Sequence, residues 1–512
     1  MSIQAENTKR IAKNTMMLYI RMMFSMVVSL FTTRIVLDIL GVEDYGIYNL
    51  VAGVVGMMNI VTGLLSQGSS RFITIALGKG DAAGLKNTFS ACLTIHLALA
   101  FLILIAGEAI GPQFISSLNI APDRLSAARF TFHFALLTAV LNLAYIPFNA
   151  TIIAHERMNI YAYIAIWEST AKLLVVYLLL VINIDKLKLF SLLYFIIGGI
   201  TAAMYYLYCR KHFAECRNLS LKPDFKLYKE IFSYIGWNTI GVCAFTMNTQ
   251  GMTILLNIFG TAVNAARGIA TTASGAIYNF ANNFMVASRP QIVKLCAVGN
   301  YKEMNSLVDR TSKFASYLIG FIGIPIFIEM DYVLGLWLKE VPEYTVVFTR
   351  LTLIQGLVQA IDTPIGIGIH AVGKMKLPNL TSAFIYMIAL PISYLAIKSG
   401  ASPEAVYIVI ICTYPVALFM DLYILNRYTG FPVIPFLLKV VRTVFFVIAT
   451  AAFTGRLVQH LMDPNILRLC FTVVISCIIF LPTIYFFGMD SGEKRFIKDI
   501  IIKKLESFKQ NP

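Results

Sequence analysis

Long apolar runs alternate along this chain with short polar segments. A transmembrane helix needs about 20 mostly apolar residues, and fourteen stretches of the 512-residue sequence meet that requirement. We expect spans near residues 14–37, 45–67, 87–109, 126–149, 160–182, 189–209, 231–259, 265–288, 313–329, 345–370, 379–397, 404–425, 438–460 and 467–487. The pattern predicts an all-α membrane protein with about fourteen transmembrane helices.

Lysine and arginine gather in every second connecting segment. With the N-terminus in the cytoplasm, about 29 of the 42 Lys and Arg residues fall in inner segments and about 7 in outer ones. Because cytoplasmic loops carry an excess of basic residues, we expect a multi-pass protein of the inner (plasma) membrane with cytoplasmic N- and C-termini. The net charge of +15 is mostly this topology signal, and its spread over many loops argues against a nucleic-acid partner.

The first apolar run is too long for a removable signal peptide, so we expect it to remain as a signal-anchor. The eight cysteines fall in predicted spans or cytoplasmic segments, where disulfides are unfavourable. Cys209, His212 and Cys216 have a spacing that matches no usual zinc pattern. We therefore expect neither disulfides nor a bound metal.

Two blocks of the sequence recur in weakened form, the first at an offset of 219 residues and the second at 217. The paired positions are Gly41 with Gly260, Gly56 with Gly275, Gly80 with Gly299, Asp81 with Asn300, Pro147 with Pro364, Ala154 with Ala371, and Met158 with Met375. Six predicted spans lie between equivalent points. An even number means that both repeats enter the membrane in the same direction, so they are parallel repeats related by an axis along the membrane normal.

The repeat divides the chain into four parts. We expect an N-lobe at 1–209, a cytoplasmic linker at 210–230, a C-lobe at 231–425, and a tail at 426–512 with two extra helices and a basic end. Two six-helix lobes around a central cavity are typical of transporters that work by alternating access.

Other classes of membrane protein fit less well. A membrane glycosyltransferase or polymerase needs a sizeable loop for acidic catalytic groups, and the longest predicted outer connections, 110–125 and 330–344, hold only about 15 residues. No G-x-x-x-x-G-K-[ST] phosphate loop is present for an ATP-driven pump. We expect neither enzymatic activity nor a cofactor.

Several motifs spread over the whole chain carry a resemblance to a known family. They are RIVLDILGVEDYGIYNLVAG at 34–53, ALGKGD at 76–81, NAARGIA at 264–270, RPQIVKLCAVGNYKEM at 289–304, LWLKEVPEYT at 336–345 and HAVGKMKLPN at 370–379. The chain resembles the bacterial polysaccharide-biosynthesis flippases of the Wzx type, within the multidrug/oligosaccharidyl-lipid/polysaccharide exporter superfamily. The resemblance implies a bacterial inner-membrane protein that moves an isoprenoid-diphosphate-linked oligosaccharide, such as an O-antigen repeat unit of lipopolysaccharide, from the cytoplasmic to the periplasmic leaflet. It also implies possible contacts with a polysaccharide polymerase or other assembly proteins.

Ionisable residues inside the predicted spans are candidates for the substrate site, because burying a charge in a bilayer is costly. Basic residues outnumber acidic ones, and guanidinium and ammonium groups bind phosphate oxygens. The candidate diphosphate partners are Arg34, Arg129, Lys172, Arg267 and Arg350. The alternative is that these side chains reach to lipid headgroups or form local ion pairs, as Arg34 could with Asp38 one turn on.

Two acidic residues are candidates for coupling transport to H⁺ or Na⁺. Glu168 lies four residues before Lys172, so the two form either a neutralised structural pair or one that Lys172 exchanges for the diphosphate. Asp362 is predicted to be the only acid deep in the second lobe, and Pro364 frees the carbonyl of Ala360 nearby. The alternative for Asp362 is a hydrogen-bonded packing residue.

Three other functions remain open at this point. A multidrug or cation antiporter of the same superfamily would need a net acidic cavity, which the excess of basic residues disfavours. A peptidoglycan-precursor flippase would share the cationic cavity, and a membrane glycosyltransferase is the weakest alternative. The expected partners are thus the lipid bilayer, a lipid-linked oligosaccharide and a coupling ion.

Overall fold

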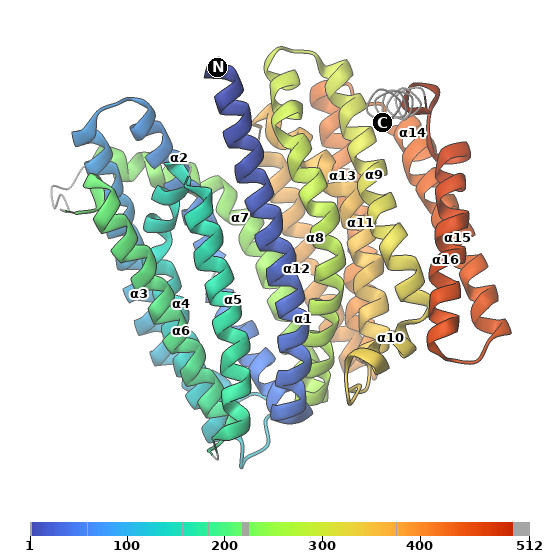
Figure 1. Ribbon diagram of the computed structural model, residues 1–512, viewed down its shortest axis with the longest axis horizontal. Coiled ribbons are helices and arrows are strands. Elements are labelled where there is room, and N and C mark those ends of the chain that lie inside the picture. The colour runs from blue at the N-terminus through green and yellow to red at the C-terminus, as the bar shows by residue number, and fades with distance from the viewer. Residues whose placement is uncertain are drawn as a thin grey trace, which may run out of the picture. The chain divides into compact units, whose positions relative to one another are not determined.

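The computed structural model describes residues 3–58, 60–155, 157–182, 184–217, 225–374 and 376–494, and its elements are helices (Figure 1). Their bounds are Ile3–Met58 (α1), Ile60–Gly78 (α2), Ala82–Ser116 (α3), Leu125–Ala154 (α4), Met158–Val181 (α5), Lys186–His212 (α6), Ala214–Cys216 (η1), Phe225–Leu256 (α7), Asn257–Phe259 (η2), Thr261–Ala297 (α8), Tyr301–Ile328 (α9), Met330–Trp337 (α10), Thr345–Val372 (α11), Lys376–Lys398 (α12), Glu404–Thr429 (α13), Val433–Phe436 (α14), Leu437–Val441 (η3), Arg442–Leu461 (α15), Ile466–Thr483 (α16) and Ile484–Gly488 (η4). Within these residues, ten helices are long and apolar enough to cross a membrane. The predicted all-α, multi-span membrane fold is confirmed.

The helix α1 contains the first predicted span and the start of the second. It is interrupted at Gly41, where φ is +77° and ψ is 171°. A residue with a Cβ atom is strained at this φ, whereas glycine adopts it readily. The chain therefore turns between the two predicted spans at Gly41.

The predicted repeat is visible in the backbone. Gly260, the partner of Gly41, has the same unusual conformation, with φ +106° and ψ 170°. The partners Gly80 and Gly299 both have positive φ, +70° and +74°. The residues that follow them, Asp81 and Asn300, each cap the next helix by accepting a hydrogen bond from a backbone N–H. Equivalent turns thus begin α3 and α9.

The chain forms two compact units. Unit 1 comprises Met1–Ala273, Leu338–Phe348 and Met375–Thr413, and unit 2 comprises Ser274–Trp337, Thr349–Lys374 and Tyr414–Pro512. These bounds follow spatial contacts, whereas the division into lobes at 1–209 and 231–425 follows the sequence repeat. The assignment of those lobes stays a prediction.

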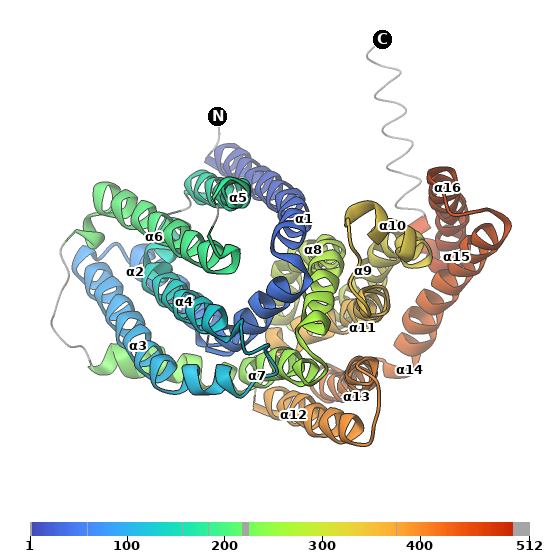
Figure 2. The same ribbon diagram turned by 90° about the horizontal axis from the view of Figure 1, so that it is seen from below.

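In unit 1, α5 lies between α1 and α6, and α4 packs against α3 and α6 (Figure 2). Small residues allow this close packing. A Cβ atom on Gly111 of α3 would lie 2.0 Å from the Phe132 ring of α4, so a larger residue there would force the helices apart. Membrane helices rely on such close approach because lipid supplies no hydrophobic drive between them.

One arginine of unit 1 joins two connecting segments to α1, just after the turn at Gly41. The guanidinium of Arg124, before α4, donates to Asp44 Oδ1 at 2.8 Å and to Asp185 Oδ2 at 2.9 Å. Asp185 also caps α6 by accepting from the Lys188 N–H. Burial would raise the pKa of Asp185, but the bonds from Lys188 and Arg124 lower it below its usual value. We call Arg124, Asp44 and Asp185 the loop clamp.

In unit 2, the helices α15 and α16 pack on each other and on α9 (Figure 1). Glu329, which follows α9, is fully buried and accepts from Arg468 of α16 at 2.7 Å and from Thr472 at 3.0 Å. Near the middle of α9, Lys313 donates to the buried Glu493, which follows α16, at 2.6 Å. Buried charges are tolerated when they are paired in this way, so both ends of the last helix pair are fixed to α9.

Candidate functional site

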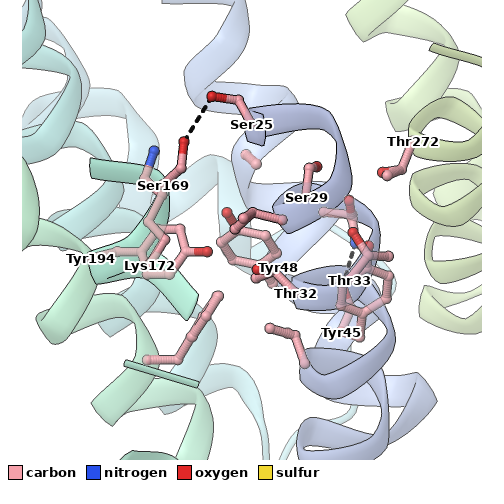
Figure 3. Close-up of a pocket in the computed structure, with 15 residues that line it drawn as sticks. Ser25, Ser29, Thr32, Thr33, Tyr45, Tyr48, Ser169, Lys172, Tyr194 and Thr272 are labelled. Carbon is pink, nitrogen blue, oxygen red and sulfur yellow. Dashed lines mark hydrogen bonds between the residues drawn. The ribbon is translucent and has the colours of Figure 1, made fainter. Parts of the chain in front are cut away.

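A pocket of about 390 Å³ lies in unit 1, with walls that come mainly from α1, α5 and α6 (Figure 3). Of its fifteen lining residues, eleven have a polar side chain. They are Ser25, Ser29, Thr32, Thr33, Tyr45, Tyr48, Asn49, Ser169, Lys172, Tyr194 and Thr272. Small-molecule sites are commonly about 300–1,000 Å³ and mostly apolar. This pocket has a suitable size and an unusually polar wall for the interior of membrane helices.

The α1 wall presents a row of hydroxyl groups. Ser25, Ser29, Thr32 and Thr33 are three or four residues apart or adjacent, so they share one face of the helix. Ser25 Oγ lies 3.0 Å from Ser169 Oγ of α5. Thr32 is only 9% exposed, and its hydroxyl finds no partner within the residues that the structure describes. Because buried polar groups are normally hydrogen bonded, this row has unused capacity to bind a polar ligand.

Aromatic side chains also line the pocket, from Tyr48 of α1 and from Phe190 and Tyr194 of α6. Phe190 and Tyr194 lie one turn apart on α6, with ring centroids separated by 4.3 Å. Tyr48 packs edge-on against Phe190 at 4.9 Å and lies 6.3 Å from Tyr194. Aromatic rings of this kind offer apolar contact area and, for tyrosine, a polar tip.

Lys172 of α5 is the single charged residue within the described lining of the pocket. Its Nζ donates to Glu168 Oε1 at 2.5 Å and lies 5.7 Å from the Tyr194 ring centroid. The i, i+4 pair that the sequence indicates is therefore formed. Glu168 is not part of the lining, so the pocket meets a ligand with an ammonium group and no carboxylate.

Two other candidate cations of unit 1 lie away from this pocket. Arg34 follows the lining residue Thr33 but does not line the pocket itself. Asp38, its expected ion-pair partner, instead accepts from Lys339 at 2.5 Å. Arg129 is exposed, and two of its nitrogens donate to Ser116 Oγ at 2.7 and 3.1 Å.

The last two candidate cations are held by backbone and side-chain acceptors. Arg267 of α8 donates to Thr253 Oγ1 at 2.8 Å and to the Thr249 carbonyl at 2.5 Å. Arg350 of α11, in unit 2, donates to Asp331 at 2.7 Å and to the Phe327 carbonyl at 3.1 Å. Of the five candidates, the structure brings Lys172 alone into the pocket lining.

Unit 2 contains a pair of acids in its helices. Asp362 of α11 interacts electrostatically with Asp421 of α13, and its Oδ1 atom is buried without a partner in the described part of the chain. Asp362 is therefore not the only acid deep in this half, and that expectation was wrong. The sequence did not identify Asp421, because a single acid near the end of an apolar run usually indicates a residue at the membrane interface.

Neutral polar groups lie near Asp362. Gln355 and Gln359 of α11 both donate to the Tyr414 hydroxyl, at 2.9 and 2.7 Å. Thr363 Oγ1 lies 3.3 Å from the Tyr278 hydroxyl. The Tyr278 and Tyr414 side chains interact electrostatically with Asp362.

The hydroxyl row of α1 was also missed from the sequence, although its spacing could have identified it. Ser and Thr are frequent in membrane helices, so only the combination of one shared face with the neighbouring Lys172 distinguishes the row. The position of that face relative to α5 and α6 depends on tertiary packing.

Known proteins resemble this chain in structure. No family model matches its sequence, and no curated protein is similar to it in sequence. A multidrug resistance MATE family transporter of the MOP superfamily, in an inward-facing conformation, is 13% identical with a TM-score of 0.66, covering 80% of this chain and 95% of the transporter. The lipid II flippase MurJ, in an inward closed conformation, is 12% identical with a TM-score of 0.68, covering 94% of this chain and 99% of the flippase.

A third similar structure is a MOP superfamily transporter from Pyrococcus furiosus, whose binding pocket is described as having reverse polarity. It is 14% identical with a TM-score of 0.57, covering 82% of this chain and 96% of the transporter. At such low identities the likeness establishes the architecture. The chain therefore has the fold of the transporters of the MOP superfamily.

Proposed function

We propose that this protein is a flippase that moves an isoprenoid-diphosphate-linked oligosaccharide from the inner to the outer leaflet of the bacterial inner membrane by alternating access. The observation that carries the proposal is the unit 1 pocket, which is polar, contains Lys172 and has no carboxylate in its described lining. An anionic, hydroxyl-rich headgroup matches these walls. The sequence motifs that resemble Wzx-type flippases support the same substrate class.

In this proposal Lys172 exchanges its partner during transport. In the structure its ammonium group is satisfied by Glu168 at 2.5 Å. A phosphate oxygen offers a stronger charge-assisted hydrogen bond than a single carboxylate shared with solvent. Glu168 then holds the lysine in position while the pocket is empty. Because Arg34, Arg129, Arg267 and Arg350 lie outside the lining, their roles as phosphate partners depend on other conformations.

The acid pair of unit 2 is the proposed coupling site. Two interacting carboxyl groups release their protons in separate steps, and protonation or Na⁺ binding at Asp362 and Asp421 changes the charge that the helices must bury. A ligand shifts a conformational equilibrium only by its different affinity for the two states. The pair can therefore couple an ion gradient to the arrangement of the helices.

Two other members of the superfamily remain as alternatives. A multidrug or cation antiporter is disfavoured by the cationic lining of the unit 1 pocket. A peptidoglycan-precursor flippase is compatible with it, and the high coverage of the lipid II flippase, 94% of this chain, fits either glycolipid. A membrane glycosyltransferase receives no support from the described residues.

The test is flipping in proteoliposomes. Purified protein is reconstituted with a fluorescent lipid-linked oligosaccharide extracted from the source cell, with lipid II as the competing substrate and a cationic dye as the third. We expect wild type to flip the oligosaccharide lipid at least tenfold faster than the dye. Transport of the dye alone would contradict the proposal, and faster flipping of lipid II would select the peptidoglycan-precursor alternative.

The proposed orientation, with both termini in the cytoplasm, is tested separately by thiol labelling from outside intact cells. A cysteine at Glu340 should react with a membrane-impermeant reagent, and the native Cys216 and Cys296 should not. External labelling of Cys216 would show that the proposed orientation is wrong.

A further inference from the structure

We propose that the unit 1 pocket is a sugar site, which binds an uncharged glycosyl ring of the substrate between the hydroxyl row of α1 and the aromatic rings of Tyr48 and Tyr194. This inference rests on the proposed function and specifies which part of the lipid-linked oligosaccharide enters the pocket. Lys172 lies in the same lining and marks the end where a neighbouring phosphate would lie (Figure 3).

The hydrogen-bonding character of the row matches a sugar. Each Ser or Thr hydroxyl is both a donor and an acceptor, as is each hydroxyl of a sugar ring. Ser29 is exposed to the pocket, and Thr32 has a hydroxyl without a partner in the described part of the chain. Asn49 adds a side-chain amide, one N–H of which already donates to the Tyr45 carbonyl at 2.8 Å. Such a wall can bind several ring hydroxyls without any fixed charge.

The aromatic side chains of the pocket supply an apolar contact for the faces of the sugar ring. A sugar ring carries hydroxyl groups around its edge and C–H bonds on its faces, so it binds well between polar groups and an apolar plane. The rings of Tyr48 and Tyr194 are inclined by 73° at a centroid distance of 6.3 Å, so they form an apolar corner against which one face and one edge of a sugar ring can pack. Phe190 contacts both rings, at centroid distances of 4.9 and 4.3 Å. Aromatic contacts add about 0.5–1.5 kcal/mol beyond the burial of area.

Other parts of the substrate fit this pocket less well. An isoprenoid chain needs an apolar wall, and eleven of the fifteen lining residues are polar. A diphosphate with several negative charges needs more than one cation or a metal ion, and the described lining holds Lys172 alone. A neutral ring with one phosphate at its edge satisfies both the hydroxyl row and the lysine.

The experiment measures protection of a cysteine placed in the pocket. Ser29→Cys protein in nanodiscs is treated with N-ethylmaleimide, and alkylation at residue 29 is followed by mass spectrometry. The exposed native Cys412 serves as the internal control. The probes are methyl glycosides of neutral hexoses and N-acetylhexosamines, sorbitol as an open-chain polyol, and inorganic pyrophosphate.

We expect at least one methyl glycoside to slow alkylation at residue 29 fivefold or more, with no effect on Cys412. Sorbitol should not protect, and the protection should survive Lys172→Ala. Equal protection by sorbitol, protection by pyrophosphate alone, or no protection by any glycoside would each overturn the sugar site.

Two threonine variants provide a matched comparison. Thr272 lines the pocket and Thr271 does not, and each hydroxyl donates to the carbonyl four residues earlier on α8, at 3.0 and 2.9 Å. Thr272→Val should raise the glycoside concentration for half-protection about tenfold, because a site built for a hydroxyl binds poorly once its partner is lost. Thr271→Val should leave it unchanged, and equal effects of the two variants would contradict the proposal.

The result is independent of the flipping assay. If wild type flips the lipid-linked oligosaccharide but no glycoside protects residue 29, the sugar site is wrong and the proposed function stands. If a glycoside protects but the oligosaccharide lipid is not flipped, the pocket binds sugar and the proposed function is wrong.

Discussion

The pocket of unit 1 and the acid pair of unit 2 differ in how charged residues are arranged within the helices. In unit 1, Lys172 and Glu168 neutralise each other along one helix, and the lysine still lines an open pocket. In unit 2, Asp362 and Asp421 have the same sign and act on each other across two helices. A charged group beside an opposite charge is stabilised in its charged form, whereas a carboxylate beside another carboxylate is stabilised by binding a proton or a cation. In the proposed function, this contrast separates a substrate site in unit 1 from a coupling site in unit 2.

The largest effect should follow from removing the pocket cation. Lys172→Ala should reduce flipping of the lipid-linked oligosaccharide about 10- to 100-fold, since a hydrogen bond to a charged group contributes about 1.5–3 kcal/mol. Lys172→Arg should retain more activity because the charge remains. The measurement is the initial flipping rate in proteoliposomes at equal protein incorporation, with the exposed Lys79→Ala as the control. A wild-type flipping rate for Lys172→Ala would show that the substrate does not bind in the unit 1 pocket.

A smaller effect is expected when the pocket receives an acid. Ser29→Asp would place a carboxylate in the lining, where it competes for Lys172 and repels phosphate. We expect the flipping rate to fall about tenfold, equivalent to about 1.4 kcal/mol. Ser29→Asn is the control of similar size without charge. Equal rates for the two variants would mean that the sign of the pocket charge does not matter.

The acid pair should affect the response to an ion gradient more than the basal rate. Asp362→Asn mimics a permanently protonated carboxyl group, so flipping should continue at the rate seen without a gradient, with its few-fold stimulation lost. Asp421→Asn should behave in the same way because it removes the second carboxylate that acts on Asp362. The assay compares proteoliposomes with and without imposed pH and Na⁺ gradients, and the exposed Glu340→Gln is the control. Wild-type stimulation in Asp362→Asn would make this aspartate a packing residue.

The smallest effect on transport is expected at the loop clamp, which lies outside both sites. Arg124→Ala should change the flipping rate less than twofold but lower the melting temperature by several degrees, because Asp44 and Asp185 lose bonds worth about 1.5–3 kcal/mol in total. Arg124→Lys should rescue only part of this loss, since lysine lacks the two-pronged guanidinium. A melting temperature equal to that of wild type would show that the clamp contributes no stability.

Hydrophobic periodicity predicted the helical framework well because the bilayer imposes a length on each apolar run. The sequence repeat paired Gly41 with Gly260 and Asp81 with Asn300, and each pair has the same backbone role in the structure, although the turns and the caps themselves were not predicted.

The sites were predicted less completely. The sequence shows that a charged residue lies within a predicted span, but it does not show which residue pairs with it. The sequence indicated the local pair of Lys172 with Glu168, which needs only helical spacing. It did not reveal that Asp421 approaches Asp362, that Lys339 binds Asp38, or that Arg267 is satisfied by α7. Each of these contacts joins residues on different elements, and their meeting depends on how the helices pack.

The loop clamp also constrains the biogenesis of the protein. A membrane protein is threaded into the bilayer from its N-terminus as the ribosome elongates it, so Asp44 and Arg124 are in place well before Asp185 is synthesised. The arginine can close its second carboxylate contact only after α5 has been inserted and α6 has begun. Chains truncated before residue 185 would therefore leave one prong of the guanidinium unused, and epitope tags inserted beside Asp185 should impair maturation more than tags in segments that the clamp does not touch.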